Sequence, residues 1–188
     1  MRYFMLAFLA CAAIAACGNP LGLSAPFTNQ VDSLVSLYAL SGTPVSSPSA
    51  YSILGQRAIR TDQGAVFDFA FDIDTLGRAL LLPTGALKLG KRSGFQISTQ
   101  DFDSIKFAPT GGYNLDSALV VHDSSVVLVY TNQSACSSSL GVAYPYYAKL
   151  KVIAIDTMPG ATTRRIDFMI LTDLNCGYRG LEPGVPRH

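Results

Sequence analysis

The chain has no tryptophan, only two histidines and few charged residues. Lysine, arginine, aspartate and glutamate make up 14% of the sequence, well below the roughly one quarter that is usual, and the formal net charge is +1. Such a chain has neither the basic footprint of a nucleic-acid-binding protein nor a basic cluster for anionic lipid headgroups. Nucleic acid is therefore excluded as an expected partner.

Recognisable catalytic and metal-binding motifs are missing as well. His122 is the one internal histidine and His188 ends the chain, so no histidine cluster is present for a metal. The sequence contains no HExxH, CxxC or Gly-x-Ser-x-Gly motif and no glycine-rich phosphate loop. We therefore expect no resident cofactor and no enzymatic activity.

The first sixteen residues have the pattern of a signal peptide. Arg2 provides a positive charge, and the apolar run 3–14 ends in small residues. That run is shorter than the roughly 20 residues that a membrane-spanning helix needs, so a cleaved leader over residues 1–16 is the better interpretation.

The end of this leader, Ile14-Ala15-Ala16-Cys17, resembles the bacterial lipobox, in which an aliphatic and two small residues precede an obligatory cysteine. The resemblance implies that Cys17 is lipidated and that its acyl chains anchor the protein to a membrane of the cell envelope. Gly18, not aspartate, follows, which in Gram-negative lipoproteins implies the outer membrane. Residues 17–26 then form a short tether. The alternative is an ordinary secreted protein in which Cys17 is incidental.

Two further cysteines lie in the exported part of the chain, Cys136 and Cys176. An even pair in an exported domain predicts a disulfide. Two buried free thiols or a catalytic cysteine are the alternatives, and no suitable base accompanies the latter.

Alternating hydrophobicity marks strands throughout the mature chain. In the clearest segment, 66–74, Phe67, Phe69, Phe71 and Ile73 face one way, whereas Asp68, Ala70, Asp72 and Asp74 face the other. We expect this segment to form a hairpin with 78–82. The other expected elements are strands at 31–40 and 57–62, hairpins of 117–122 with 126–131 and of 146–156 with 164–172, and a helical turn at 101–105.

Many short strands at regular spacing predict an all-β fold, a single antiparallel β-sandwich or flattened barrel that spans residues 27–188. Its tail, 175–188, is rich in glycine and proline and is expected to pack as an extended loop. The predicted disulfide places this tail near Cys136.

Carboxylates gather on one face of the clearest strand. Asp72 and Asp74 lie near its end, where a calcium ion is conceivable because hard cations prefer several oxygen ligands. Leu76 stands where a calcium loop needs an oxygen ligand, however. Carboxylates from Asp68, Asp72 and Asp74 also suit glycoside hydrolysis. The interpretation that we prefer is the solvated side of an amphipathic strand.

An aromatic cluster provides the candidate binding surface: Tyr144, Tyr146 and Tyr147, with Lys149 continuing the face of Tyr147 as a basic edge. Tyrosine combines a broad apolar face with a polar tip, which suits contact with a sugar, a peptide or another protein. The alternative is that these tyrosines cover strand surface and are half-buried at sheet edges.

Three short stretches, Phe102-Asp103-Ser104, 126–130 and 147–152, resemble the order of segments in haem-carrier lipoproteins of the HmuY type. In that family a Tyr-Ala-Lys strand follows a valine-rich strand within an all-β fold. The resemblance implies an all-β surface lipoprotein. The family's pair of haem-ligating histidines has no counterpart in this sequence.

Together these features favour a membrane-anchored envelope lipoprotein that acts as a non-enzymatic binding or interaction module, with an envelope protein or a glycan as its partner. The first alternative is a carrier of a small ligand or metal, such as haem or calcium. The second is an envelope hydrolase that uses carboxylates.

Overall fold

The computed structural model describes residues 25–132, 143–159 and 163–186. The predicted leader, Cys17, most of the tether over residues 17–26, and Cys136 lie outside the described residues. No helix in the described ranges is long and apolar enough to cross a membrane.

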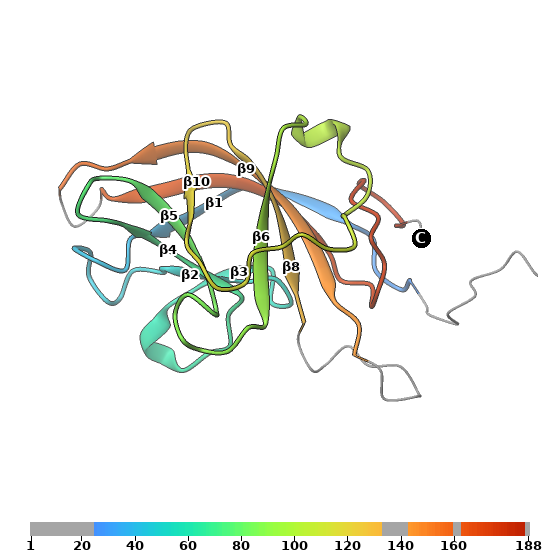
Figure 1. Cartoon of the computed structure of the whole chain (residues 1–188), viewed down its shortest axis with the longest axis horizontal. Helices are drawn as coiled ribbons and strands as arrows, with labels where there is room; N and C mark the ends of the chain where they lie inside the picture. Colours follow the sequence, from blue (N-terminus) through green and yellow to red (C-terminus); the bar gives the residue numbers. More distant parts are fainter. Residues whose placement is uncertain (1–24, 133–142, 160–162, 187–188) are drawn as a thin grey trace, which may run out of the picture.

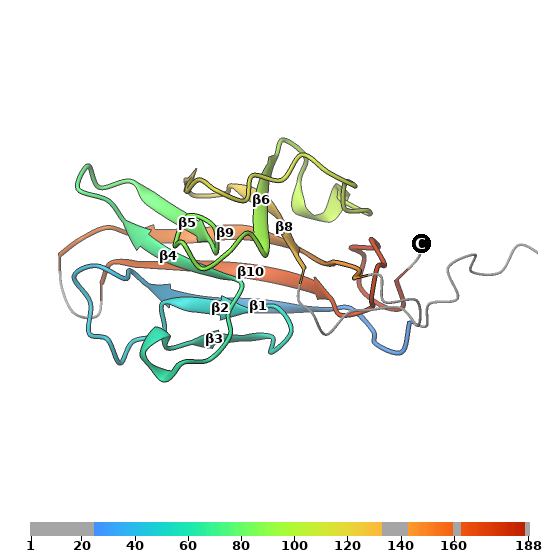
Figure 2. The same cartoon turned by 60° about the horizontal axis from the view of Figure 1, so that its bottom comes forward.

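The chain folds into two five-stranded antiparallel sheets, which confirms the predicted all-β sandwich (Figures 1 and 2). Two 3-10 turns, η1 (Thr61–Gln63) and η2 (Phe102–Ser104), interrupt the strands. The first sheet contains, in spatial order, β1 (Gln30–Tyr38), β10 (Arg165–Asp173), β9 (Tyr146–Asp156), β8 (Val126–Thr131) and β6 (Ser93–Ser98). The second contains β3 (Arg57–Ile59), β2 (Ala50–Ser52), β4 (Phe69–Ile73), β5 (Ala79–Pro83) and β7 (Leu119–Val121).

Four aromatic rings join the two sheets in the core. Tyr51 of β2 stacks on Phe69 of β4 with ring centroids 5.5 Å apart. Phe95 of β6 meets Phe69 edge-on at 5.5 Å, and Phe168 of β10 meets Tyr51 at 5.9 Å. Because each sheet contributes two rings, this cluster stabilises the contact between the layers.

Most predicted elements are confirmed. The β4–β5 and β9–β10 hairpins have the expected partners, and η2 lies within 101–105. The strand expected at 57–62 ends earlier, because η1 begins at Thr61. The strand expected at 31–40 is β1, but a bulge between Asp32 and Val35 changes its register. Val31 therefore leaves the face that Val35 occupies and is exposed.

The hairpin predicted between 117–122 and 126–131 is wrong. β7 pairs with β5 in the second sheet, whereas β8 pairs with β6 and β9 in the first. The turn at 123–125 carries the chain between sheets, with Ser124 at a φ of 67° and the Ser125 N–H donating to the His122 carbonyl at 3.0 Å. Alternation identifies two neighbouring strands but does not assign them to the same sheet.

The carboxylate of Asp68 links the two sheets inside the core. The sequence places it on a solvated strand face, but it is 1% exposed, because it precedes β4 and the alternation of that strand begins at Phe69. Its Oδ2 accepts a hydrogen bond from the Ile53 N–H after β2, and its Oδ1 accepts one from the Thr131 hydroxyl in β8, both at 2.6 Å. Its backbone carbonyl accepts from the Ser93 hydroxyl in β6. Strands of both sheets therefore share one carboxyl group.

The tail packs as the expected extended loop and closes one end of the sandwich. Asn29 and Gly184 exchange backbone hydrogen bonds of 2.7 and 2.9 Å, and Leu181 is buried. The described chain therefore begins and ends at the same end of the molecule, opposite the tips of the β4–β5 and β9–β10 hairpins (Figure 1).

Replacing Asp68 with alanine leaves the Thr131 hydroxyl and the Ile53 N–H without their acceptor in the core. We expect the free energy of unfolding to fall by about 3 kcal/mol, since each buried group left unsatisfied costs about 1–3 kcal/mol. Urea unfolding measures the change. Asp123→Ala, in an exposed turn, is the control, and a shift there of less than about 0.5 kcal/mol is expected. Equal effects of the two substitutions would contradict the structural role of Asp68.

Candidate functional site

The outer face of the first sheet, which points away from the second sheet, is covered by the segment around η2 and by the tail. Leu128 of β8 and Tyr147 of β9 pack there against Phe102, Ile105 and Leu181. This cover decides which side chains of the sheet are available to a partner.

The predicted tyrosine surface is wrong, because its members are buried on two different faces. Tyr146 points into the core between the sheets, and Tyr144 packs partly buried against that core. Tyr147 lies under the outer cover, where its ring packs against Tyr113 and Tyr130 at centroid distances of 6.2 and 6.0 Å. Burial raises the pKa of the Tyr147 hydroxyl. These tyrosines are packing residues, but Tyr146 and Tyr147 are buried in the central strand β9 and not half-buried at a sheet edge, as the alternative interpretation expected.

Lys149 is also buried, at 2% exposed, and does not form a basic edge. Its Nζ donates hydrogen bonds to the carbonyls of Phe102 at 2.7 Å and Ile105 at 2.9 Å, and lies 4.4 Å from the centroid of the Phe102 ring. Burial lowers the pKa of its ammonium group, and the carboxylates of Asp103 and Glu182 oppose that shift. Lys149 therefore holds the η2 turn against the sheet.

Asp72 and Asp74, the candidate cation ligands, have hydrogen-bond partners within the chain. Asp74 accepts from the Arg78 N–H at 2.9 Å and from Arg78 Nε at 2.6 Å, and these bonds lower the pKa of its carboxyl. Asp72 accepts from the N–H and the hydroxyl of Ser41, both at 2.9 Å. Arg164 lines the same hollow as Asp72 and Asp74 and brings a positive charge to it. Nowhere in the described part do three or more histidine, cysteine or acidic side chains gather as metal ligands.

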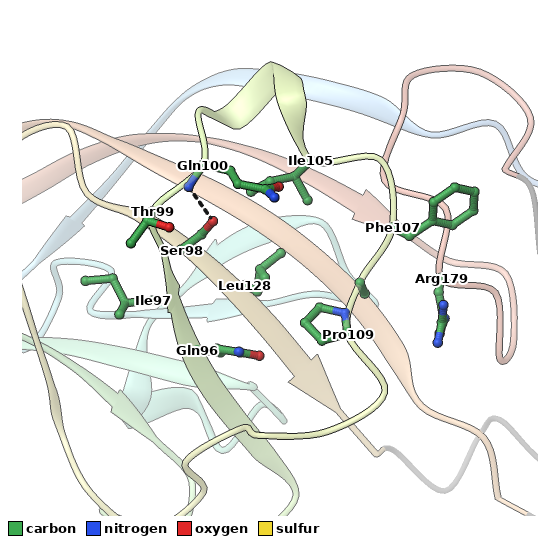
Figure 3. A pocket seen from close by; sticks show the side chains of 11 residues that line it. Gln96, Ile97, Ser98, Thr99, Gln100, Ile105, Phe107, Pro109, Leu128 and Arg179 are labelled. Carbon is green, nitrogen blue, oxygen red and sulfur yellow. Dashed lines mark hydrogen bonds between the residues drawn. The ribbon is translucent and has the colours of Figure 1, made fainter.

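An open groove with a volume of about 450 Å³ lies on the outer face beside β6 (Figure 3). Leu128 of β8 lies in its floor. One wall consists of β6 and the residues that follow it, 96–100, and the opposite wall consists of residues 107–109 and Arg179 from the tail (Figure 3). The groove therefore joins three distant parts of the chain.

The groove combines apolar contact with one positive charge. Ile97, which alternates with the core-facing Phe95, and Phe107 lie at its two rims and are 51% and 41% exposed. Arg179 is the one charged residue among those that line the groove, and no carboxylate or histidine lines it. Gln96, Ser98, Thr99 and Gln100 also line it, so a ligand that fits combines apolar groups with hydrogen-bonding groups and an anionic group.

β6 also has an open backbone edge, on its side away from β8, because it is the last strand of its sheet. Phe95 exchanges backbone hydrogen bonds of 3.0 and 2.8 Å with Asn114 on that edge. Alternate residues of an antiparallel strand direct their N–H and C=O groups to the same side, so those of Ile97 also point to the open edge. Such groups pair with an incoming strand.

No protein-family model matches the chain, and no curated protein matches it significantly. Sequence reasoning missed the groove because β6 was not expected. The alternation of Phe95, Gln96 and Ile97 is the signal that could have revealed this strand.

Replacing Lys149 with methionine keeps the length of the side chain but removes the donor for two carbonyls. We expect the free energy of unfolding to fall by about 2 kcal/mol, because the carbonyls of Phe102 and Ile105 stay buried without a partner. Hydrogen exchange should also show lost protection in residues 102–108.

Lys151→Met is the matched control for this substitution, two residues further along the same strand and only half-buried. Its unfolding free energy should change by less than about 0.5 kcal/mol. If Lys149→Met proves as stable as this control, Lys149 does not hold the η2 turn.

Proposed function

We propose that this chain is a lipid-anchored, non-enzymatic binding module of the bacterial cell envelope, and that its partner is a polypeptide segment seated in the groove beside β6. The observation that carries the proposal is the groove itself. It exposes Ile97 of the edge strand β6 at one rim and Phe107 at the other, while the cover buries the neighbouring outer face.

Three features favour a polypeptide over a glycan in this groove. The N–H and C=O groups of Ile97 match the backbone of an extended segment, which adds to an edge strand through main-chain hydrogen bonds. Ile97 and Phe107 suit an aliphatic or aromatic side chain from that segment. Arg179 suits an acidic side chain, since its guanidinium pairs well with a carboxylate. A sugar would be expected to stack on a broader set of exposed aromatic faces.

The lipobox-like sequence before Cys17 supports the anchor. Two or more acyl chains hold a protein stably on a membrane, whereas a single chain binds marginally. Gly18 after the modified cysteine favours the outer membrane if the cell is Gram-negative. We also propose that Cys136 and Cys176 form the disulfide expected of an exported pair; Cys176 packs half-buried against the core.

The alternatives find less support in the described residues. A hydrolase that uses Asp68, Asp72 and Asp74 needs free carboxylates around one cleft, but Asp68 faces the core and the other two accept hydrogen bonds at turns. A haem or metal carrier needs ligands at its pocket. His122 lines a different hollow, next to Val121, and is not at the groove.

Cys17→Ser tests the anchor in the full-length protein. Without the thiol no acyl chain is attached, so we expect metabolic labelling with a radioactive fatty acid to be lost and the protein to leave the membrane fraction. Cys176→Ser is the control and should keep both the label and the fraction. Undiminished labelling of Cys17→Ser would show that the anchor lies elsewhere.

A photo-crosslinking amino acid in place of Phe107 tests the groove in intact cells. We expect a protein adduct of defined mass from this position and none from Leu76, which is more exposed and lies at the far hairpin tip. Ile97→Asp in the same chain should abolish the adduct, because the bound partner would have to cover the new carboxylate, which costs free energy.

The melting temperature of the Ile97→Asp chain should remain within about 2 °C of the parent, since the side chain is exposed. A glycan adduct, or a protein adduct that still forms in the Ile97→Asp chain, would contradict the proposal of a polypeptide partner.

A further inference from the structure

Two buried oxygen atoms where the start of β1 meets the end of β10 have no hydrogen-bond partner: Oδ1 of Asn29 and Oδ2 of Asp173. Gln30 lies opposite Thr172, so one step further along the register places Asn29 opposite Asp173. The backbone groups of Asn29 bond to Gly184 on the other side, which makes this a pair without mutual backbone bonds. The side chains of such pairs approach most closely.

The orientation of each side chain is fixed by its other hydrogen bonds. Asn29 Nδ2 donates to the carbonyls of Gly180 at 2.7 Å and Glu182 at 3.2 Å, so its Oδ1 faces away from them. Asp173 Oδ1 accepts from the N–H and from Nδ2 of Asn175, both at 2.8 Å, which leaves Oδ2 free. Two acceptors enclosed side by side are unfavourable unless a donor joins them.

We propose that Asp173 keeps a proton on Oδ2 in the folded protein and donates it to Oδ1 of Asn29, so that the two side chains form a pH-sensitive latch. The latch holds the start of β1 and the tail against the end of β10. Asn175 extends it, because Asn175 Nδ2 donates to the Phe27 carbonyl at 2.9 Å and the Phe27 N–H donates to Asn175 Oδ1 at 3.0 Å. Ionisation of Asp173 breaks the shared hydrogen bond and loosens the segment through which the chain enters the domain. The latch does not depend on the groove or its partner.

The surroundings of Asp173 favour its neutral form. Burial raises the pKa of the Asp173 carboxyl to about 6, and the hydrogen bonds from Asn175 oppose this shift. The titratable group opposite it on β9 is Tyr147, whose own pKa is raised by burial, so it stays neutral. In the described part of the tail, Glu182 pairs with Lys106 at 3.7 Å, Arg179 lines the groove and Tyr178 is buried.

The direction of the pH effect follows from the raised pKa. An unfolded aspartate has a pKa of about 3.9, so the folded protein binds the Asp173 proton more tightly than the unfolded chain does. The stability that this proton contributes is fully present below about pH 4 and is lost as the pH rises through about 6. The latch is therefore closed in mildly acidic surroundings and open at neutral pH.

Urea unfolding between pH 5 and pH 7.5 tests the latch. The contribution of Asp173 to the folding equilibrium constant should fall about tenfold over this range. Asp173→Asn should abolish this fall, because the amide donates to Asn29 Oδ1 at every pH while its oxygen still accepts from Asn175. Asp123→Asn, in an exposed turn, should retain the fall seen in the parent.

Nuclear magnetic resonance separates a latch from a carboxyl group that is merely buried. We expect the carboxyl carbon of Asp173 to titrate near pH 6, and Asn29→Ser to lower that pKa by at least about half a unit, because the neutral form loses its acceptor. Hydrogen-exchange protection of the Asn29 amide should fall at pH 7.5 in the parent but not in Asp173→Asn. A parent pKa below about 5, an unchanged pKa in Asn29→Ser, or stability that follows added sodium or calcium and not pH would overturn the proposal.

Discussion

A carboxyl group inside a protein core is tolerated only where donors surround it, and Asp68 meets this condition at the junction of the two sheets. Hydrophobic contacts have no preferred direction, whereas hydrogen bonds do. Asp68 must meet Thr131 of the first sheet while it holds the end of β2 in the second. Ser93 strengthens the same junction, since its hydroxyl also accepts from the Thr84 N–H at 3.0 Å. The stacking of the four core rings takes place next to this fixed point.

The architecture was predictable because alternation needs no long-range information. Phe69, Phe71 and Ile73 all face the core as their spacing indicated, and the β9–β10 hairpin follows from two long alternating runs around a turn. The pairing of 117–122 was not predictable in this way. Its strand turns toward the other sheet, and the pattern of buried residues is the same in either sheet. β2 was missed because all three of its residues are buried, which removes the alternation.

The candidate site was predicted less well than the fold, because the cover of the outer face comes from distant parts of the chain. Tyr147 and Lys149 share a strand face that would be exposed in an isolated hairpin. Phe102, Ile105 and Leu181 bury that face. Nothing in the sequence of residues 144–149 predicts that these distant residues cover it. A lysine drawn to backbone carbonyls and a lysine in water look the same in a sequence. The groove beside β6 has the same origin, since its walls meet only after the tail folds back.

Both ends of the described chain lie at the same end of the sandwich, and this arrangement has a mechanical consequence. A pulling force applied through the residues before Ala25 acts along the length of β1. This strand pairs antiparallel with β10 over nearly its whole length. Hydrogen bonds between these strands run perpendicular to such a pull, so they share the load and must yield together. The bonds between Asn29 and Gly184 bring the tail into the same loaded region. A domain pulled from its N-terminus in this way resists through shear between β1 and the rest of its first sheet.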